Sequence, residues 1–458
     1  MSALLAFLLV FVQDSDAERL RKLEETVKKQ QSEIDELKKK QDSPAAAAPF
    51  TASLQDGLRF RTADGNVDLH AGGRFQEHWR VILDRPDGAA PAAANQRTTP
   101  DTFLIRAARL QIDGTFYKDY GFVVESDFPS QSAVSGTATP TLQKAYVEWK
   151  RWAEFSLRFG QFKAPQSQEE LCSLLFTEFN ERSILSRFVP SYDIGLQAQG
   201  RLFENVVAYQ AAITNGRSHL ENAGRLRNDD NDEKEYLGRV TVSPFVTDKD
   251  SVFAGLRLGI YGSSTDVDNV AMSPAATSNA FDIVTPELGV LMLDPTGGLL
   301  DGHRRRLGTE FSYSIGPVGL RSEYLWRRDG MVNVPRTVDT DVRTQAWYAA
   351  VSWILTGEDK LFENRIMPAG DWGAVEVAFR VAGCKIGDNI SQVFTPATLA
   401  GQSTRLTSYT FGINWWVTRQ LRVSFDAISE DYHTDIAFGN GVNKDNLYGF
   451  LTRFQIDF

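Results

Sequence analysis

Basic side chains recur on the polar face of several alternating segments in the first half of the chain. In these segments apolar and polar residues take alternate positions, so every second residue lies on one face of an extended strand. Rings of Arg or Lys select anions in a water-filled passage, and a guanidinium can bind two phosphate oxygens at once. The pattern therefore predicts anion binding at inward positions near the long connections between segments. The candidate residues are Arg74, Arg80, Arg109, Arg158 and Arg201.

Two further basic residues, Lys163 and Arg182, lie in a long interruption between alternating segments. We expect Arg182, which follows Glu181, to anchor this interruption, whereas Lys163 could equally well contact a solute. For the whole basic set an alternative stays open, namely that each cation pairs with a carboxylate and stiffens the wall. The candidate carboxylates are Asp113, Glu125 and Asp127.

No pattern typical of catalysis accompanies these basic groups. The five His residues and two Cys residues form no HExxH, CxxC or GxSxG pattern, and there is no P-loop. An outer-membrane phospholipase would need Ser, His and Asn together on an outward face, whereas alternation turns His70 and His78 inward. We therefore predict no enzyme activity, no cofactor, no metal site and no nucleic-acid binding.

The composition allows only one kind of membrane crossing. Charged residues make up 24% of the 458 residues, the formal net charge is −10, and no run of eighteen apolar residues follows the N-terminus. These features exclude a transmembrane helix but not a transmembrane β-barrel, whose alternating strands hide their hydrophobicity in any average. Aromatic residues, at 11%, are frequent enough to form the girdles of such a barrel.

Sixteen alternating segments follow one another, and an even number is typical of bacterial barrels. Long and short connections alternate between them, with one exception at 356–370, so all long connections would emerge at one end. The apolar face of each segment would contact lipid and the polar face an aqueous lumen. The segments are 67–83, 102–117, 121–128, 141–150, 155–162, 193–202, 206–214, 235–246, 251–263, 304–315, 318–328, 342–355, 371–382, 403–418, 420–431 and 444–458.

Within this barrel, strict alternation would turn Arg106 outward with Leu104. A charge near the bilayer midplane costs roughly 2–4 kcal/mol, so this orientation is unfavourable. A β-bulge near Ala107 and Ala108 would turn Arg106 inward instead. We predict this bulge, together with an Arg cluster near the long connections that faces Lys163 across a constriction.

The longest interruption in the first half, residues 160–195, is predicted to fold back into the lumen as a constriction loop at about 163–192. Pro165 and Pro190 bracket a part that could hold a short helix. An ordered loop of this length is usually functional rather than a linker. Cys172 in this loop and Cys384 are predicted on the extracellular side, where one disulfide is a possibility.

The N-terminal region is predicted to contain three segments outside the barrel. Residues 1–17 resemble an export signal, because an apolar core precedes a small-x-small site. Residues 18–43 carry a heptad seam and are predicted to form a coiled-coil stalk, or alternatively a single solvated helix. Residues 44–55 are a linker before the barrel, 56–458. The seam residues are Leu20, Leu23, Val27, Gln30, Ile34, Leu37 and Gln41.

Several short motifs, in order, resemble the phosphate-selective porins O and P. They are GGRFQ at 72–76, FLIRAARL at 103–110, GTFYK at 114–118, GQFKAP at 160–165, EEL at 169–171, FNERS at 179–183 and DIG at 193–195. The resemblance implies a homotrimeric outer-membrane channel with a narrowing loop after the fifth strand. This chain has Ile105 and Tyr192 where the family often has Arg, and both changes remove positive charge.

We therefore predict an all-β, 16-stranded antiparallel barrel that acts as a passive outer-membrane channel for small anions such as phosphate or polyphosphate. Its partners would be two further copies of the chain and outer-membrane lipid, with the stalk in the periplasm. Two alternatives stay open: a general diffusion porin without anion preference, and a structural anchor that contacts the cell wall through the stalk.

Overall fold

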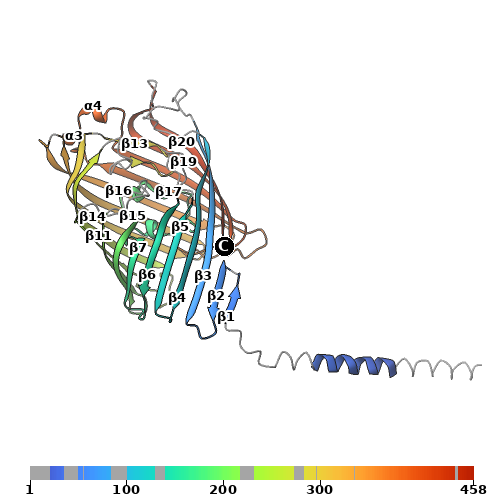
Figure 1. Ribbon diagram of the computed structural model, residues 1–458. Helices are drawn as coiled ribbons and strands as arrows, with labels where there is room; N and C mark the ends of the chain where they lie inside the picture. Colours follow the sequence, from blue (N-terminus) through green and yellow to red (C-terminus); the bar gives the residue numbers. More distant parts are fainter. Residues whose placement is uncertain are drawn as a thin grey trace, which may run out of the picture.

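Sixteen antiparallel strands close into a barrel in the computed structural model (Figure 1), as predicted. The structure describes residues 21–35, 50–54, 56–83, 101–128, 140–216, 232–272, 283–295, 297–334, 336–438 and 442–458. The barrel closes where the last strand pairs with the first, from Tyr448 opposite Leu83 to Asp457 opposite Arg74. The strands are β3 (Val67–Leu83), β4 (Thr102–Phe116), β5 (Tyr120–Asp127), β6 (Thr141–Trp149), β7 (Ser156–Lys163), β8 (Tyr192–Leu202), β9 (Val207–Thr214), β10 (Glu235–Val242), β11 (Leu256–Met272), β14 (Gly298–Ile315), β15 (Val318–Asn333), β16 (Asp339–Ile354), β17 (Ala374–Ile386), β18 (Arg405–Trp416), β19 (Leu421–Ala437) and β20 (Asn443–Asp457).

The two faces of the wall are polar inside and apolar outside. On β20, Arg453 and Gln455 are fully buried in the interior, whereas the intervening Phe454 is exposed on the outer surface. On β3, His78 is buried and the next residue, Trp79, is exposed and stacks on Phe103 of β4. This arrangement suits a barrel that faces lipid, because polar groups would be costly on the outer surface.

Three predicted connections differ from the observed ones. The connection between β11 and β14 spans only 273–297, because the two strands pair as far as Met272 and Gly298. The connection between β10 and β11 spans 243–255 and is longer than the predicted four-residue turn at 247–250. The exception in the alternation of loop lengths, 355–373, folds back against the barrel, which explains why it is not a tight turn.

The segment 164–191 lies inside the barrel and reaches the opposite wall. It contains the short helices α2 (Gln168–Leu171) and η1 (Ile184–Arg187). The Gln168 side chain donates hydrogen bonds to backbone carbonyls of β14 and β15, and Asn180 donates to the carbonyl of Leu451 on β20. We call residues 164–191 the lumen loop.

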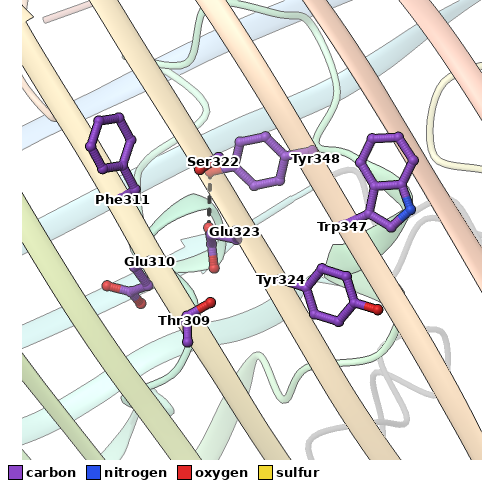
Figure 2. Close-up of a pocket in the computed structure, with 8 residues that line it drawn as sticks. All are labelled: Thr309, Glu310, Phe311, Ser322, Glu323, Tyr324, Trp347 and Tyr348. Atoms are coloured by element: carbon purple, nitrogen blue, oxygen red, sulfur yellow. Dashed lines mark hydrogen bonds between the residues drawn. The ribbon is translucent and has the colours of Figure 1, made fainter.

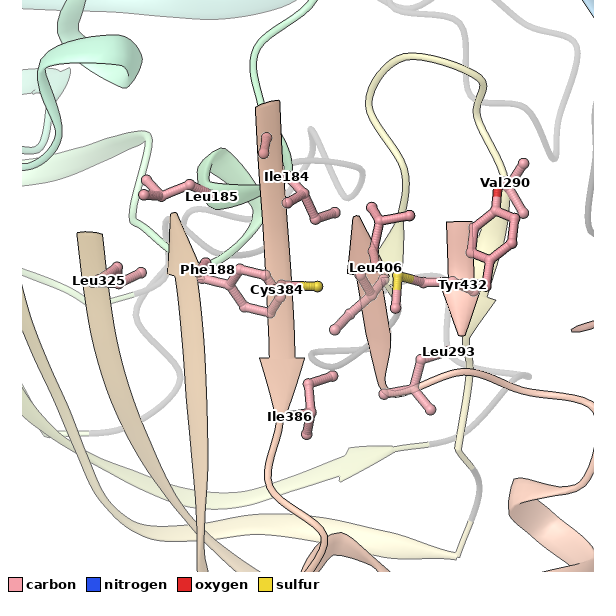
Figure 3. Close-up of a cluster of buried hydrophobic side chains, with 14 of the residues drawn as sticks. Ile184, Leu185, Phe188, Val290, Leu293, Leu325, Cys384, Ile386, Leu406 and Tyr432 are labelled. Carbon is pink, nitrogen blue, oxygen red and sulfur yellow. The ribbon is translucent and has the colours of Figure 1, made fainter. Parts of the chain in front are cut away.

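A second inward segment joins the lumen loop in an apolar cluster at the end of the barrel that carries the long connections. We call residues 283–293 the second inward segment; it contains β12 (Ile283–Val284) and β13 (Leu291–Leu293). Leu185 of the lumen loop and Val290 of this second segment belong to one cluster with wall residues such as Leu406 (Figure 3). The cluster fills the interior beside β14–β20 and extends to β3 and β11, so this part of the lumen is packed rather than open.

Smaller elements lie at both ends of the barrel. The helices α3 (Ile390–Val393) and α4 (Pro396–Leu399) follow β17, at the same end as the long connections (Figure 1). At the other end, β1 (Phe50–Ser53) and β2 (Leu58–Thr62) form a hairpin, and β2 pairs with β3. The strand β1 falls within the predicted linker, which is therefore partly structured.

The N-terminal predictions are only partly covered by the structure. Residues 21–35 are helical and exposed throughout, including Leu23, Val27 and Ile34 of the heptad seam. The predicted export signal, 1–17, and both ends of the predicted stalk lie outside the described residues. Among the described helices, none is long and apolar enough to cross a membrane.

Candidate functional site

A β-bulge on β4 turns Arg106 toward the lumen loop. Gln76 of β3 pairs with Ala107, and the next residue, Glu77, pairs with Ile105, so Arg106 is the additional residue. Its guanidinium donates two hydrogen bonds to the Glu181 carboxylate, at 2.5 and 3.1 Å. The bulge predicted near Ala107 and Ala108 is thus confirmed, and its inward Arg106 binds the lumen loop.

The predicted cluster facing Lys163 across an opening is wrong, because Lys163 and Arg109 lie on the same side. Arg109 donates a hydrogen bond to the Tyr192 hydroxyl at 3.4 Å, and the Lys163 ammonium lies 5.5 Å from the centre of the Tyr192 ring. Lys163 also lies 3.4 Å from the Glu170 carboxylate of the lumen loop. Tyr192 therefore contacts both cations.

Arg182 contacts the lumen loop itself. Its guanidinium donates hydrogen bonds to the backbone carbonyls of Glu169, Glu170 and Cys172, and it lies 3.4 Å from the Glu170 carboxylate. Arg182 therefore fixes the backbone of the loop, and these contacts use most of the five N–H donors of its guanidinium.

Glu125 on β5 gathers three cations. Lys144 lies 3.2 Å, Arg109 3.1 Å and Arg74 3.8 Å from its carboxylate. Arg109 also pairs with Asp127 at 2.7 Å, and Arg74 donates to the Ser173 hydroxyl of the lumen loop. The pairing of basic groups with wall carboxylates is thus present at these positions, but the cations outnumber the carboxylates.

The other predicted basic residues occupy different surroundings. Arg158 lies 3.3 Å from Glu148 and stacks 4.3 Å above the Tyr146 ring. Arg80 interacts electrostatically with Glu181 of the lumen loop. Arg201 is exposed next to the turn that begins at Phe203, and Arg158 also lies in this half of the barrel. Their predicted position near the long connections is wrong, because β7 and β8 meet the short turns at these residues.

A set of buried arginines on the opposite wall holds the lumen loop and was not predicted. Arg380 pairs with Glu169 at 3.0 Å and with Glu287 of the second inward segment at 2.7 Å. Arg321 pairs with Glu178, and Arg453 donates to backbone carbonyls of the lumen loop. Alternation already turns Arg453 inward, and the same parity applied to β15 and β17 would have found the others.

The segment 355–373 covers part of the end of the barrel that carries the short turns. Lys360 is buried between two carboxylates, at 2.9 Å from Glu178 of the lumen loop and 2.5 Å from Glu376 of β17. Glu363 of the same segment pairs with Arg257 of β11 at 2.9 Å. The segment therefore spans from one wall to another beneath the lumen loop.

The family model of the phosphate-selective porins O and P matches residues 87–458. The chain belongs to this family. It is an outer-membrane porin, and this agrees with its closed 16-stranded barrel. No curated protein shows a significant match.

Solved outer-membrane channels are similar to this porin at low sequence identity. The outer membrane channel DcaP of Acinetobacter baumannii is 11% identical, with a TM-score of 0.51 over 88% of this chain and 100% of that chain. OmpT of Vibrio cholerae is 9% identical, with a TM-score of 0.47 over 86% and 98%. An anion-selective porin from Comamonas acidovorans is 11% identical, with a TM-score of 0.48 over 86% and 100%.

Electrostatics explain how the lumen loop of this porin keeps its carboxylates charged. Burial alone would raise the pKa of Glu181, but the Arg106 guanidinium outweighs this effect and the pKa is lowered. In the same way Arg182 and Lys163 lower the pKa of Glu170 against the effect of burial. Both loop carboxylates therefore remain ionised and keep their cations at neutral pH.

The two cysteines of the porin are free and buried, so the possible disulfide does not form. Cys172 lies in the lumen loop rather than at the extracellular surface, which corrects its predicted position. Burial raises the pKa of the Cys172 thiol. Within the described residues, no group of three His, Cys, Asp or Glu side chains is arranged to hold a metal ion.

Proposed function

We propose that this porin passes small anions, with phosphate and polyphosphate as the best candidates, and that it has no enzyme activity. One observation carries the proposal: in the ion pairs made by Arg and Lys side chains of β3–β10, the cation is more accessible than its carboxylate. The side chain of Arg106 is 31% exposed and that of Glu181 7%; the values are 28% for Lys144 and 6% for Glu125. Arg239 and Glu310 follow the same pattern, at 12% and 3%.

This difference in exposure matters because a solute interacts with the charges that it can approach. A positive lining with low-dielectric walls behind it concentrates anions, even though the whole chain is acidic. Glu125 has three cations around it and Glu170 has two, so local positive charge exceeds negative charge. The passage would run between the lumen loop and β4–β10, because apolar side chains pack the opposite side of the interior.

We further propose a homotrimer with a periplasmic stalk. The exposed seam residues of helix 21–35 would be covered by the same helices of partner subunits. The outward Glu77 of β3 supports contact through the barrel wall, because a charge in the apolar band is less costly against a partner subunit than against lipid. A stalk that contacts the cell wall would be an additional, anchoring role.

Reversal potentials in planar bilayers test the anion preference against a general diffusion porin. Under a KCl gradient we expect chloride to be more permeable than potassium, and added phosphate to reduce the chloride current. Lys144→Gln leaves Arg74 and Arg109 beside Glu125, so the barrel should fold while the permeability ratio falls about two- to fivefold, equivalent to at most ~1 kcal/mol. Lys118→Gln, in an exposed turn, is the matched control. Equal permeability in the unmodified porin, or no difference between the two variants, would contradict the proposal.

A further inference from the structure

Five basic side chains form a row around the outer surface of five neighbouring strands. Strand register places Arg305 of β14 opposite Arg328 of β15, and Arg328 opposite Arg343 of β16. Lys385 of β17 lies opposite Arg405 of β18, and its other neighbour, Gln345, is two residues from Arg343. All five are exposed and alternate with inward, buried residues. We call these residues the outer basic row.

The outer basic row lies at the edge of the apolar band, at the end of the barrel that carries the long connections. On two strands the next outward residue is apolar or aromatic, namely Leu307 after Arg305 and Trp326 before Arg328. On the other three strands such a residue follows one outward position later, at Trp347, Val381 and Tyr409. Such an edge is where the aromatic girdle of a barrel meets lipid headgroups. In porins the long connections face the outside of the cell, so these headgroups are those of the outer leaflet.

The charge of the outer basic row is only partly balanced within the described residues. Arg328 pairs with Asp341, and Arg405 lies 3.4 Å from Asp388. The side chains of Arg305, Arg343 and Lys385 form no ion pair with any residue that the structure describes. Like charges directly opposite on neighbouring strands destabilise a sheet, and a bound anion relieves this repulsion.

A hollow of about 400 Å³ lies in the same part of the wall (Figure 2). Its outward-facing lining consists of Thr309, Phe311, Ser322, Tyr324 and Trp347, which alternate with inward Glu310, Glu323 and Tyr348. Tyr324 and Trp347 are each four residues along their strands from the outer basic row, a distance of about 13 Å. Half of a hydrocarbon core is about 15 Å thick, so an acyl chain from a headgroup at the row reaches the hollow.

We propose that this face binds a phosphorylated, multiply acylated lipid of the outer leaflet, of the lipid A type. The guanidiniums of the outer basic row bind its phosphate groups, and one acyl chain occupies the hollow. A second copy of the chain does not suit this face, because two such rows would repel each other.

The test compares two charge-matched triple variants of the full-length porin in detergent. Arg305→Gln, Arg343→Gln and Lys385→Gln remove the cations of the row that have no described ion-pair partner. Lys118→Gln, Lys150→Gln and Lys249→Gln remove three exposed cations at the other end of the barrel. We expect the first variant to bind bis-phosphorylated lipid A at least tenfold more weakly than the unmodified porin, and the control variant to bind it normally. Equal binding by both triple variants would overturn the proposal.

Two further measurements distinguish binding of the lipid headgroup from binding of an acyl chain. Ser322→Trp fills the hollow, whereas Ser429→Trp changes an outward serine of β19. We expect only Ser322→Trp to weaken lipid A binding, and neither to change the binding of inorganic phosphate. Normal lipid A binding by Ser322→Trp would overturn the assignment of the hollow. Retention of phosphatidylglycerol as tight as that of lipid A would overturn the assignment of the lipid.

Discussion

Glu181 and Arg106 show how a single ion pair fixes the position of the lumen loop. Arg106 reaches the loop only because a bulge adds one residue to β4, and the partially exposed guanidinium keeps a nearly buried carboxylate ionised. The same pair contributes positive charge to the proposed passage, because Arg106 is its more accessible member. One contact therefore serves both the structure of the loop and the charge of the lumen.

At this scale we predict that Glu181→Gln loosens the lumen loop. The substitution removes the charge-assisted contact between Arg106 and the loop at a partly buried site, which costs about 1–3 kcal/mol. We expect higher and more variable single-channel conductance in planar bilayers, together with a lower melting temperature. Glu148→Gln, which affects contacts with wall residues such as Arg158 and Gln199 and not with the lumen loop, should change the conductance less. Equal effects of the two substitutions would show that Glu181 does not hold the loop.

Acidification should release the same contacts. The pKa values of Glu170 and Glu181 are lowered in the folded protein, so their contribution to loop attachment is complete above the ordinary Glu value of 4.5. This contribution is lost as the pH falls through the lower pKa values of the folded state. We expect constant conductance from pH 7 to pH 5. Below about pH 4 we expect the conductance to increase or to fluctuate more strongly. A conductance change centred near pH 6 would point to other groups.

At the scale of elements, the lumen loop and the second inward segment determine how much of the barrel stays open. The loop brings carboxylates and backbone carbonyls to Arg321, Arg380 and Arg453, and so supplies much of the hydrogen bonding that these buried charges need. Its apolar residues Ile184 and Leu185 pack with the second segment. The loop is thus part of the interior packing and not only an obstacle in the passage.

We therefore predict two effects of removing residues 166–186. Single-channel conductance should rise, because the loop crosses the lumen. Thermal stability should fall by several degrees or more, because the buried arginines lose their acceptors and the apolar cluster loses one side. Conductance recordings and heat-induced unfolding in detergent measure these effects. If an assembled barrel without the loop conducts like the unmodified porin, the loop does not restrict the passage.

At the scale of the whole molecule, barrel and stalk contribute differently to assembly. A short heptad seam with a polar Gln30 is marginal alone, whereas barrel walls offer large apolar surfaces. We predict that deletion of residues 18–43 weakens the trimer without abolishing it, as measured by the temperature at which trimers dissociate in detergent. Leu23→Ser with Val27→Ser should act in the same direction, and Lys22→Ser with Lys29→Ser, away from the seam, should not. Complete conversion to monomers after the deletion would contradict this division.

The amino-acid sequence by itself determined the barrel and the orientation of most of its side chains. Period-two alternation separates a lipid face from a lumen face, and this local rule predicted the sixteen strands and the inward Arg74 and Arg109. The cost of a charge in the apolar band predicted the bulge at Arg106. Both arguments need only neighbouring residues and the nature of the solvent on each side.

The tertiary structure alone decided which cations are paired and which part of the lumen is filled. Arg380 and Glu169 are 211 residues apart in the chain, and Lys360 meets Glu178 from a segment that looked like an irregular turn. The apolar cluster joins the lumen loop, the second inward segment and strands of the wall, and the apolar residues of these parts follow no common period. Periodicity describes the face on which a side chain lies but not the partner it meets across a lumen, because that partner is set by how distant segments fold into the barrel.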